Sequence, residues 1–161
     1  MESTISITDA GFSYGDGDVF TGINLDVSKG EMLCLLGANG CGKTTLLHCV
    51  SGALKLKSGK VKLDGRDIAS MKASQIARKV GFVFQEHSAP FPYPVIDVVC
   101  MGRAPHLSMF SAPSKEDRRI AEEALEKVGM LHLRDKPYTK ISGGERQLVL
   151  IARTIAQQPE V

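Results

Sequence analysis

The chain has 161 residues, of which 43% are hydrophobic and 24% charged, a composition that supports the core of one ordinary globular domain and argues against disorder. Its 20 Lys and Arg residues against 18 Asp and Glu residues give a net charge of +2 without any long run of like charges, so we expect no nucleic-acid arm. No apolar stretch approaches the length of a membrane-spanning helix, and we therefore expect a cytoplasmic protein that touches a membrane only peripherally.

The first 30 residues alternate between apolar and polar positions, which is the pattern of half-buried strands. The apolar positions are Ile5, Ile7, Ile23, Leu25 and Val27. Glycine, aspartate and asparagine residues separate the two groups, so we predict a small antiparallel sheet.

A run of five apolar residues follows at positions 32–36 and ends at Gly37. Such a run is typical of a strand buried on both faces, and it predicts the first core strand of an α/β layer. A segment without glycine or proline then extends from Lys43 to about Val50, with Gly52 just beyond it. We therefore predict a strand, a glycine-rich loop and a helix, in that order.

Two further strands are predicted before residue 86. Val61 and Leu63 alternate with lysines and precede Asp64-Gly65, a dipeptide that favours a hairpin turn. Residues 80–84 form another short apolar run, which leads into Gln85.

Residues 86–114 contain five of the seven prolines, together with several aromatic residues. This composition predicts a surface connector in which residues 95–102 form one short helix. Connectors of this kind often carry contacts with a partner protein, although a long loop without such a role has the same composition.

Two amphipathic helices are predicted in the last third of the chain. The first begins at a capping box formed by Ser114 and Asp117 and ends at Gly129. Its predicted buried face consists of Ile120, Ala121, Ala124, Leu125 and Val128. The second extends from Gly143 to about Gln157. Its predicted buried face consists of Leu148, Ile151, Ala152 and Ile155.

Residues 37–44, GANGCGKT, match the G-x-x-x-x-G-K-[ST] pattern of a phosphate-binding loop, after a predicted buried strand and before a predicted helix. Glycines let backbone N–H groups converge on phosphate oxygens, and the helix start adds the positive end of a dipole. We expect Lys43 to reach the β- and γ-phosphates, Thr44 to bind Mg²⁺ and Thr45 to lie near the α-phosphate. The predicted nucleotide-binding residues of this phosphate loop are Gly37, Ala38, Asn39, Gly40, Cys41, Gly42, Lys43, Thr44 and Thr45. A plain glycine turn is the simpler alternative.

Residues 141–147, ISGGERQ, form a second motif, called here the double-glycine segment. Ser142 with Glu145 three residues later is a capping box, which explains a helix start without any ligand. Gly143 and Gly144, however, each cost a helix about 1 kcal/mol relative to alanine. That cost is understandable if another group must approach the backbone closely at this point.

The double-glycine segment resembles the Leu-Ser-Gly-Gly-Gln signature motif of the ATP-binding cassette (ABC) family, with Ile141 in place of leucine and Glu145 in place of glutamine. The order of the motifs is also similar, because Tyr14 precedes the phosphate loop and Gln85 separates it from the double-glycine segment. The resemblance implies that Tyr14 stacks on adenine and that Gln85 ligates Mg²⁺ and senses a membrane partner. An ordinary strand-end tyrosine and a polar strand terminus are the alternatives.

The fold that the resemblance implies is α/β, of the P-loop NTPase class, with an N-terminal antiparallel β subdomain and an α-helical signature subdomain. Residues 1–85 would hold the β subdomain and the phosphate-loop core, and residues 86–161 the connector and the helical subdomain. Two subunits would bind ATP and Mg²⁺ head to tail, each ATP lying on the phosphate loop of one chain and on the double-glycine segment of the other. The contacting residues of that segment would be Ser142, Gly143, Gly144 and Glu145.

Within the family, residues 63–85 and 97–125 look most like the ATPases of importers for iron chelates, haem or vitamin B12. The resemblance implies an ATPase subunit at the inner face of the cell membrane. It would contact transmembrane permease subunits near residues 86–112 and would have no nucleic-acid partner. The sequence does not indicate which chelate is carried.

The resemblance covers about the first two-thirds of a family domain. In the family, an apolar strand ending in Asp-Glu, a dimer-contacting loop and a switch histidine come later. No Asp-Glu dipeptide occurs in this chain, and Asp97 comes too early to replace it. We therefore assign no catalytic residue and expect nucleotide binding without hydrolysis by this chain alone. We also expect an incomplete core parallel sheet between residues 32–36 and 80–84, and hence an oligomeric or marginally stable protein.

Two other function classes share a phosphate loop. A complete small P-loop kinase or GTPase would turn nucleotide over by itself and has no need of the double-glycine segment. An ABC-type ATPase of DNA repair would carry long coiled coils, and the sequence shows no sustained heptad pattern.

Overall fold

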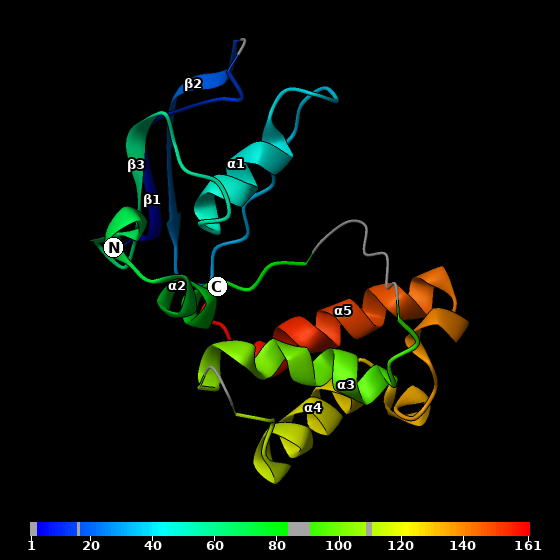
Figure 1. Cartoon of the computed structure of the whole chain (residues 1–161). Helices are drawn as coiled ribbons and strands as arrows, with labels where there is room; N and C mark the ends of the chain where they lie inside the picture. Colours follow the sequence, from blue (N-terminus) through cyan, green and yellow to red (C-terminus); the bar gives the residue numbers. More distant parts are fainter. Residues whose placement is uncertain (1–2, 16, 84–90, 109–110) are drawn as a thin grey trace. The chain divides into compact units, whose positions relative to one another are not determined.

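The structure, a computed structural model, describes residues 3–15, 17–83, 91–108 and 111–161, which fall into two compact units. The first unit comprises Met1–Ile76 with Val161, and the second comprises Ala77–Glu160. Figure 1 shows the strands in the first unit and a group of helices in the second. Gln85 lies outside the described residues, and the predicted division of the domain after residue 85 stays a prediction.

A four-stranded antiparallel sheet, in the order β2-β1-β3-β4, is the framework of the first unit. Its strands are β1 (Ser3–Ser13), β2 (Asp18–Ser28), β3 (Ser58–Leu63) and β4 (Arg66–Asp67). Ile7 of β1 stands opposite Leu25 of β2 and Val61 of β3, so β1 pairs with a neighbour on each side. The antiparallel sheet predicted for the first 30 residues is confirmed.

The predicted hairpin between β3 and β4 is also confirmed. Asp64 and Gly65 have φ angles of 46° and 75°, the left-handed values that a two-residue turn needs in order to follow the twist of a sheet. The short helix η1 (Ile68–Ser70) and helix α2 (Ala73–Lys79) come after this hairpin.

Helix α1 (Lys43–Val50) has the bounds that the sequence predicts. Its buried residues are Leu46, Cys49 and Val50. Gly52, just beyond its end, has a φ of 74°, and a Cβ there would lie 2.8 Å from Cδ1 of Ile76. Glycine therefore serves both the left-handed turn after α1 and the close packing of Ile76 against it.

The prediction of a buried strand at residues 32–36 is wrong. These residues belong to no strand, and the exposed fractions of Met32 and Leu36 are 96% and 88%. A strand needs a neighbour that pairs with its backbone N–H and C=O groups, and the described residues place none beside this segment. Its apolar side chains therefore stay in water.

The strand predicted at residues 80–84 is not found in the part of it that the structure describes, residues 80–83. The side-chain amide of Gln157 donates hydrogen bonds to the carbonyl oxygens of Ala77 and Val80, at 2.9 Å for Val80. A helix end thus provides polar partners that a sheet would otherwise supply. Over the described ranges, the strand pairs are antiparallel only, so the core parallel sheet is incomplete as expected.

Three helices form the core of the second unit: α3 (Val95–Cys100), α4 (Lys115–Lys127) and α5 (Gly143–Gln157). Figure 1 shows them packed side by side, and the short helices η2 (Met101–His106), η3 (Leu131–Leu133) and η4 (Tyr138–Lys140) lie between them in the chain. The predicted short helix is therefore confirmed as α3, but its predicted surface position is wrong. Its buried residues are Val95, Ile96, Val98, Val99 and Cys100. A helix that is apolar on nearly all sides has to be enclosed.

Helix α4 begins at the predicted capping box. Ser114 Oγ accepts a hydrogen bond from the backbone N–H of Asp117 at 3.1 Å, and the Asp117 carboxylate accepts one from the backbone N–H of Ser114 at 2.9 Å. The predicted face is confirmed, with Ala121, Ala124 and Leu125 buried and with Ile120 and Val128 partly buried against the same core. No helix in the described part of the chain is long and apolar enough to cross a membrane.

Helix α5 has the predicted range, but its buried face is rotated relative to the prediction. The buried residues are Val149, Leu150, Ala152 and Ala156, while the predicted Leu148, Ile151 and Ile155 are only partly buried. A Cβ at Gly102 of η2 would lie 2.1 Å from the carbonyl oxygen of Arg153, which shows how closely η2 approaches this helix. Where two backbones approach closely, small residues such as Ala152 and Ala156 occupy the buried face of the helix. A prediction based on large apolar residues does not find such a face.

Candidate functional site

The phosphate loop leads directly into α1. Gly42 is the N-cap of this helix, with φ 92° and ψ 8°, and Gly40 has a φ of 83°. No side chain caps the start of α1 by a hydrogen bond. The first backbone N–H groups of a helix have no partner inside the helix, so they are available here to an anion.

Contacts with β2 explain why the last glycine of the loop has no side chain. A Cβ at Gly42 would lie 2.8 Å from Cγ1 of Val19 and 3.1 Å from Cδ1 of Phe20. A Cβ at Gly37 would lie 2.9 Å from Sγ of Cys41, on the opposite side of the same loop. The loop is therefore held close to the sheet by backbone that only glycine allows.

The side chain of Lys43 lies over its own loop. Its ammonium group donates hydrogen bonds to the carbonyl oxygens of Gly37 at 2.8 Å and Ala38 at 2.7 Å, and it lies 3.6 Å from Sγ of Cys41. This arrangement brings the positive charge of Lys43 to the centre of the loop. A phosphate oxygen can take the place of these neutral carbonyl acceptors and gain the stronger charge-assisted bond.

The structure brings Tyr14 and Thr45 together at the start of α1. Tyr14 Oη lies 3.5 Å from Thr45 Oγ1, and the phenol ring, 70% exposed, meets the ring of Phe12 edge to face at a centroid distance of 4.8 Å. An exposed aromatic ring that is fixed on one side can accept a planar base on the other. Thr44, the preceding residue, is exposed.

Asn39 and Cys41 complete the predicted loop residues, and both are exposed. The sequence interpretation missed Val19 and Phe20 behind the loop and Phe12 beneath Tyr14. The Phe12 contact has a signal in the sequence, because Tyr14 directly follows β1 and residues two apart in an extended chain share a face. The positions of Val19 and Phe20 behind the loop have no such signal in the sequence, because they depend on how β2 pairs in the sheet.

The double-glycine segment starts α5. Ser142 Oγ accepts a hydrogen bond from the backbone N–H of Glu145 at 3.3 Å, and Glu145 Oε2 accepts one from the backbone N–H of Ser142 at 2.7 Å. The bond from the Ser142 backbone N–H, followed by the side-chain bond with Ser142, lowers the pKa of Glu145. The carboxylate is thus turned back on its own helix, away from the position of a ligand in front of the helix start.

Contacts inside the chain do not require the two glycines of this segment. Apart from chain neighbours and the nearby backbone of α5 itself, no atom of the described residues lies within 4 Å of a Cβ built on Gly143 or Gly144, and neither glycine has a positive φ. Gly102 is the opposite case, since the carbonyl oxygen of Arg153 excludes any side chain there. The open space in front of Gly143 and Gly144 leaves room for a group from outside the chain.

The phosphate loop and the double-glycine segment belong to different compact units, Met1–Ile76 and Ala77–Glu160. Each segment contains the start of its own helix, α1 or α5. The structure brings Tyr14 next to Thr45 and Lys43 onto the phosphate loop in the first unit, and it brings Ser142 and Glu145 together around Gly143 and Gly144 in the second. Gln85 lies outside the described residues and is assigned to neither.

Comparison with known proteins identifies a family that spans most of the chain. A family model described as ABC transporter matches residues 20–161. The molybdate import ATP-binding protein MolC of Haemophilus influenzae is 38% identical over 159 residues, which cover 98% of this chain and 58% of MolC. The iron(3+)-hydroxamate import ATP-binding protein FhuC of Bacillus subtilis is 37% identical over 159 residues, which cover 99% of this chain and 59% of FhuC.

A solved structure shares both sequence and fold with the chain. It is an inward-facing conformation of an ABC transporter described as of metal-chelate type, with 38% identity and a TM-score of 0.83 over 98% of this chain and 57% of that one. The chain thus spans somewhat more than half the length of the relatives it matches.

Proposed function

The chain belongs to the ABC transporter family, and on that premise we propose that it forms the nucleotide-binding part of an importer's ATP-binding subunit. The observation that carries this proposal is the position of Lys43, whose ammonium group lies within 2.8 Å of the Gly37 and Ala38 carbonyl oxygens at the start of α1. Lysine charge, loop backbone and helix start converge on one point, where the phosphates of ATP would bind.

The nucleoside end of ATP would lie against Tyr14. Its ring has one exposed face and is supported by Phe12, so it can stack on adenine without rearrangement of the sheet. The residues proposed to hold the triphosphate are those of the loop: Gly37, Ala38, Asn39, Gly40, Cys41, Gly42, Lys43, Thr44 and Thr45.

Magnesium fits the oxygen donor that Thr44 presents. Its hydroxyl is exposed beside the loop, and Mg²⁺ prefers such hard oxygen ligands together with phosphate oxygens and water. Gln85 is the second proposed ligand, on the basis of its resemblance to the family's glutamine. When bound, the ion would neutralise charge on the phosphates.

The double-glycine segment of a second copy would close the site. Gly143 and Gly144 leave open space at the start of α5, and Ser142 and Glu145 cap this helix so that its remaining N–H groups face outward. Two helix starts would then face one triphosphate from opposite sides, in a head-to-tail dimer. The open glycines support this arrangement because no contact among the described residues requires glycine at these two positions.

For the cargo, we propose a metal chelate such as an iron siderophore, haem or cobalamin. The hydroxamate importer FhuC and the metal-chelate type transporter support this class. MolC, whose name indicates molybdate, is equally similar, so identity alone does not select the cargo. The transmembrane permease would contact the chain near residues 86–112, which would place it at the inner face of the cell membrane.

Titration of the 161-residue chain with a fluorescent ATP analogue and Mg²⁺ tests this proposal. Lys43→Ala removes the charge at the loop centre and is expected to weaken binding by at least about tenfold. Lys29→Ala, an exposed lysine in a turn outside the loop, makes the same change of charge and is expected to leave binding unchanged. Equal affinities for the three proteins would refute the proposal.

Binding is the chosen readout because no residue of this chain is assigned to polarise the attacking water. We propose that the chain alone binds ATP without turning it over. Release of phosphate by the isolated chain, above the rate of the Lys43→Ala variant, would contradict this part of the proposal.

A further inference from the structure

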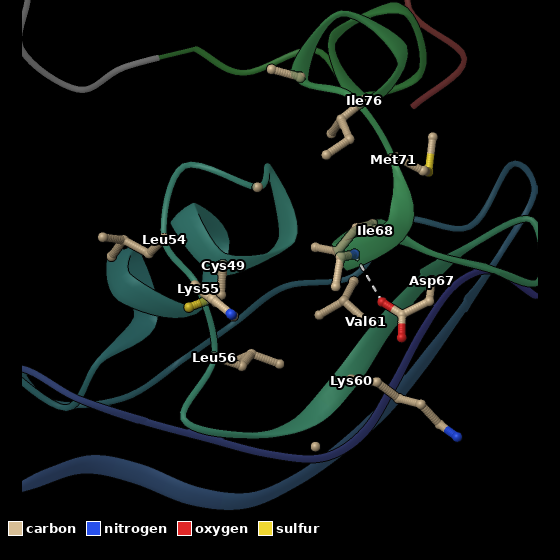
Figure 2. Close-up of a pocket in the computed structure, with 14 residues that line it drawn as sticks. Cys49, Leu54, Lys55, Leu56, Lys60, Val61, Asp67, Ile68, Met71 and Ile76 are labelled. Carbon is tan, nitrogen blue, oxygen red and sulfur yellow. Dashed lines mark hydrogen bonds between the residues drawn. The ribbon is translucent and has the colours of Figure 1, made fainter.

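A pocket of about 340 Å³ lies in the first unit, between the end of α1 and the segment from β3 to α2 (Figure 2). This is within the size range of pockets that bind small organic molecules. None of the residues proposed to bind nucleotide lines it. It is therefore a candidate for a separate site, independent of the proposed function.

Apolar side chains make up two walls of this pocket. Cys49, Leu54 and Leu56 form the wall on the side of α1, and the opposite wall is formed by Val61, Ile68, Met71 and Ile76. Within these walls, Cys49, Val61 and Ile76 are buried. Ala69 and Ala73 are exposed at the rim, where their small side chains leave the entrance open.

Two lysines and one aspartate are the charged residues of the lining. Both lysines are exposed, and Figure 2 shows the side chain of Lys60 pointing away from the other labelled side chains. Neither lysine forms an ion pair with a described residue. Asp67 accepts a hydrogen bond from the backbone N–H of Ala69 at 2.9 Å, so its carboxylate is engaged in capping η1.

From this combination we propose that the pocket binds a small free carboxylic acid with an unbranched apolar tail, of the fatty-acid type. The carboxylate would pair with Lys55, which forms no ion pair with a described residue and follows α1 in the chain. The tail would lie along Ile68, Met71 and Ile76 on the opposite wall, where burial of methylene groups provides the driving force. The negative charge of Asp67 keeps the carboxylate at the Lys55 side.

Cys49 offers a direct readout of occupancy because it is one of the residues that line the pocket. N-ethylmaleimide labelling of each cysteine can be followed by mass spectrometry of the separate peptides, with octanoate as the probe. At a concentration about four times its Kd, octanoate is expected to slow the labelling of Cys49 about fivefold. Cys100 is an internal control, since it is equally buried but lies in the second unit. Unchanged labelling of Cys49, or equal slowing at Cys100, would overturn the proposal.

Two exposed lysines provide a matched pair of variants. Lys55→Gln is expected to reduce the protection of Cys49 by octanoate at least threefold. Lys60→Gln is expected to leave this protection unchanged. Octanol has nearly the same tail without a charge and is expected to protect less. Equal protection by octanol, or equal effects of the two variants, would show that Lys55 does not select a carboxylate.

A variant that fills the entrance tests the location. Ala73→Leu adds volume at an exposed helix position, so it is expected to fold, which circular dichroism can verify. It should abolish protection of Cys49 by octanoate. Full protection in this variant would place octanoate elsewhere and overturn the assignment. Nucleotide binding through Lys43 is measured separately, so failure here leaves the proposed function untouched.

Discussion

Arg103 and Asp117 form a buried ion pair in the second unit, with 2.9 Å between Nε and Oδ1 and with side chains only 8% and 11% exposed. Arg103 also donates hydrogen bonds to the carbonyl oxygen of Ala156 at 2.8 Å and to the side chain of Gln158 at 2.9 Å. One guanidinium group therefore joins η2, the start of α4 and the end of α5. These three places are far apart in the sequence.

Arg103→Ala is expected to destabilise the chain by about 3 kcal/mol, because it leaves a buried carboxylate without its cation. Denaturation with urea measures the change in free energy of unfolding. The matched control is Arg119→Ala. This arginine pairs with Glu116 and Glu123 on the exposed surface of α4, so the same substitution should have little effect. Similar decreases in the free energy of unfolding for both variants would contradict the prediction that the buried pair stabilises the chain more than the exposed one.

Acid should weaken the second unit in a defined pH range. The hydrogen bond from Ser114 Oγ, followed by that from Arg103, lowers the pKa of Asp117 to about 2 in the folded chain. Because the unfolded carboxyl has a pKa of about 3.9, its contribution is fully present above that value and is lost as the pH falls towards about 2. Asp117→Asn should be less stable at neutral pH and should show a shallower decline below pH of about 4. Parallel pH profiles of the two proteins would refute this assignment.

For the double-glycine segment we predict that one substitution raises stability and weakens self-association. Gly144→Ala should raise the free energy of unfolding by up to about 1 kcal/mol, since alanine favours the helix and its methyl group would meet no described residue outside the backbone of α5. The same change should weaken ATP-dependent self-association, measured by sedimentation velocity, because the added methyl group lies where the second copy approaches. Gly129→Ala is the control for stability, and it should destabilise because Gly129 has a φ of 73°. A Gly144→Ala variant with unchanged association would contradict the proposed contact.

The exposed apolar run at residues 32–36 should make the chain self-associate without nucleotide. Met32 and Leu36 are nearly fully exposed on a segment without strand partners, an arrangement that promotes edge-to-edge contacts. Replacing both with lysine should lower the mass measured by light scattering, with little change in stability. A dilute, stable monomer of the unmodified chain would show that this segment is not a site of association.

Local signals predicted much of the fold. Both capping boxes lie at the starts of α4 and α5, the Asp64-Gly65 turn joins β3 to β4, and α1 has its predicted bounds. Each of these depends on residues within a few positions of one another, so their chemistry is contained in the local sequence.

Predictions that needed a distant partner failed. Residues 32–36 have the composition of a buried strand, yet no neighbouring strand pairs with them in the described ranges. Helix α3 has the proline-rich surroundings of a surface segment, yet α4 and α5 enclose it. The same limit applies to the site. The sequence predicts Lys43 and Gly143, whereas the packing of Val19 and Phe20 behind the loop depends on strand pairing.

The proposed nucleotide site is shared between two copies of the chain, and mixing two defective variants tests this most directly. Lys43→Ala removes the positive charge from the phosphate loop. Gly144→Asp places a negative charge where the triphosphate bound to the other copy would lie. An acidic residue in the first turn of a helix favours the helix, so the second variant should fold. In a mixed pair, one site combines the intact loop of one chain with the intact double-glycine segment of the other.

The decisive measurement is the affinity of this mixture for the fluorescent ATP analogue with Mg²⁺. If the site is shared, the mixture should bind with nearly the affinity of the unmodified chain, at no more than half of its sites. Each variant alone should bind at least about tenfold more weakly. Binding by the mixture that equals the sum of the two separate variants would contradict a shared site, because nucleotide would then be held by one chain alone.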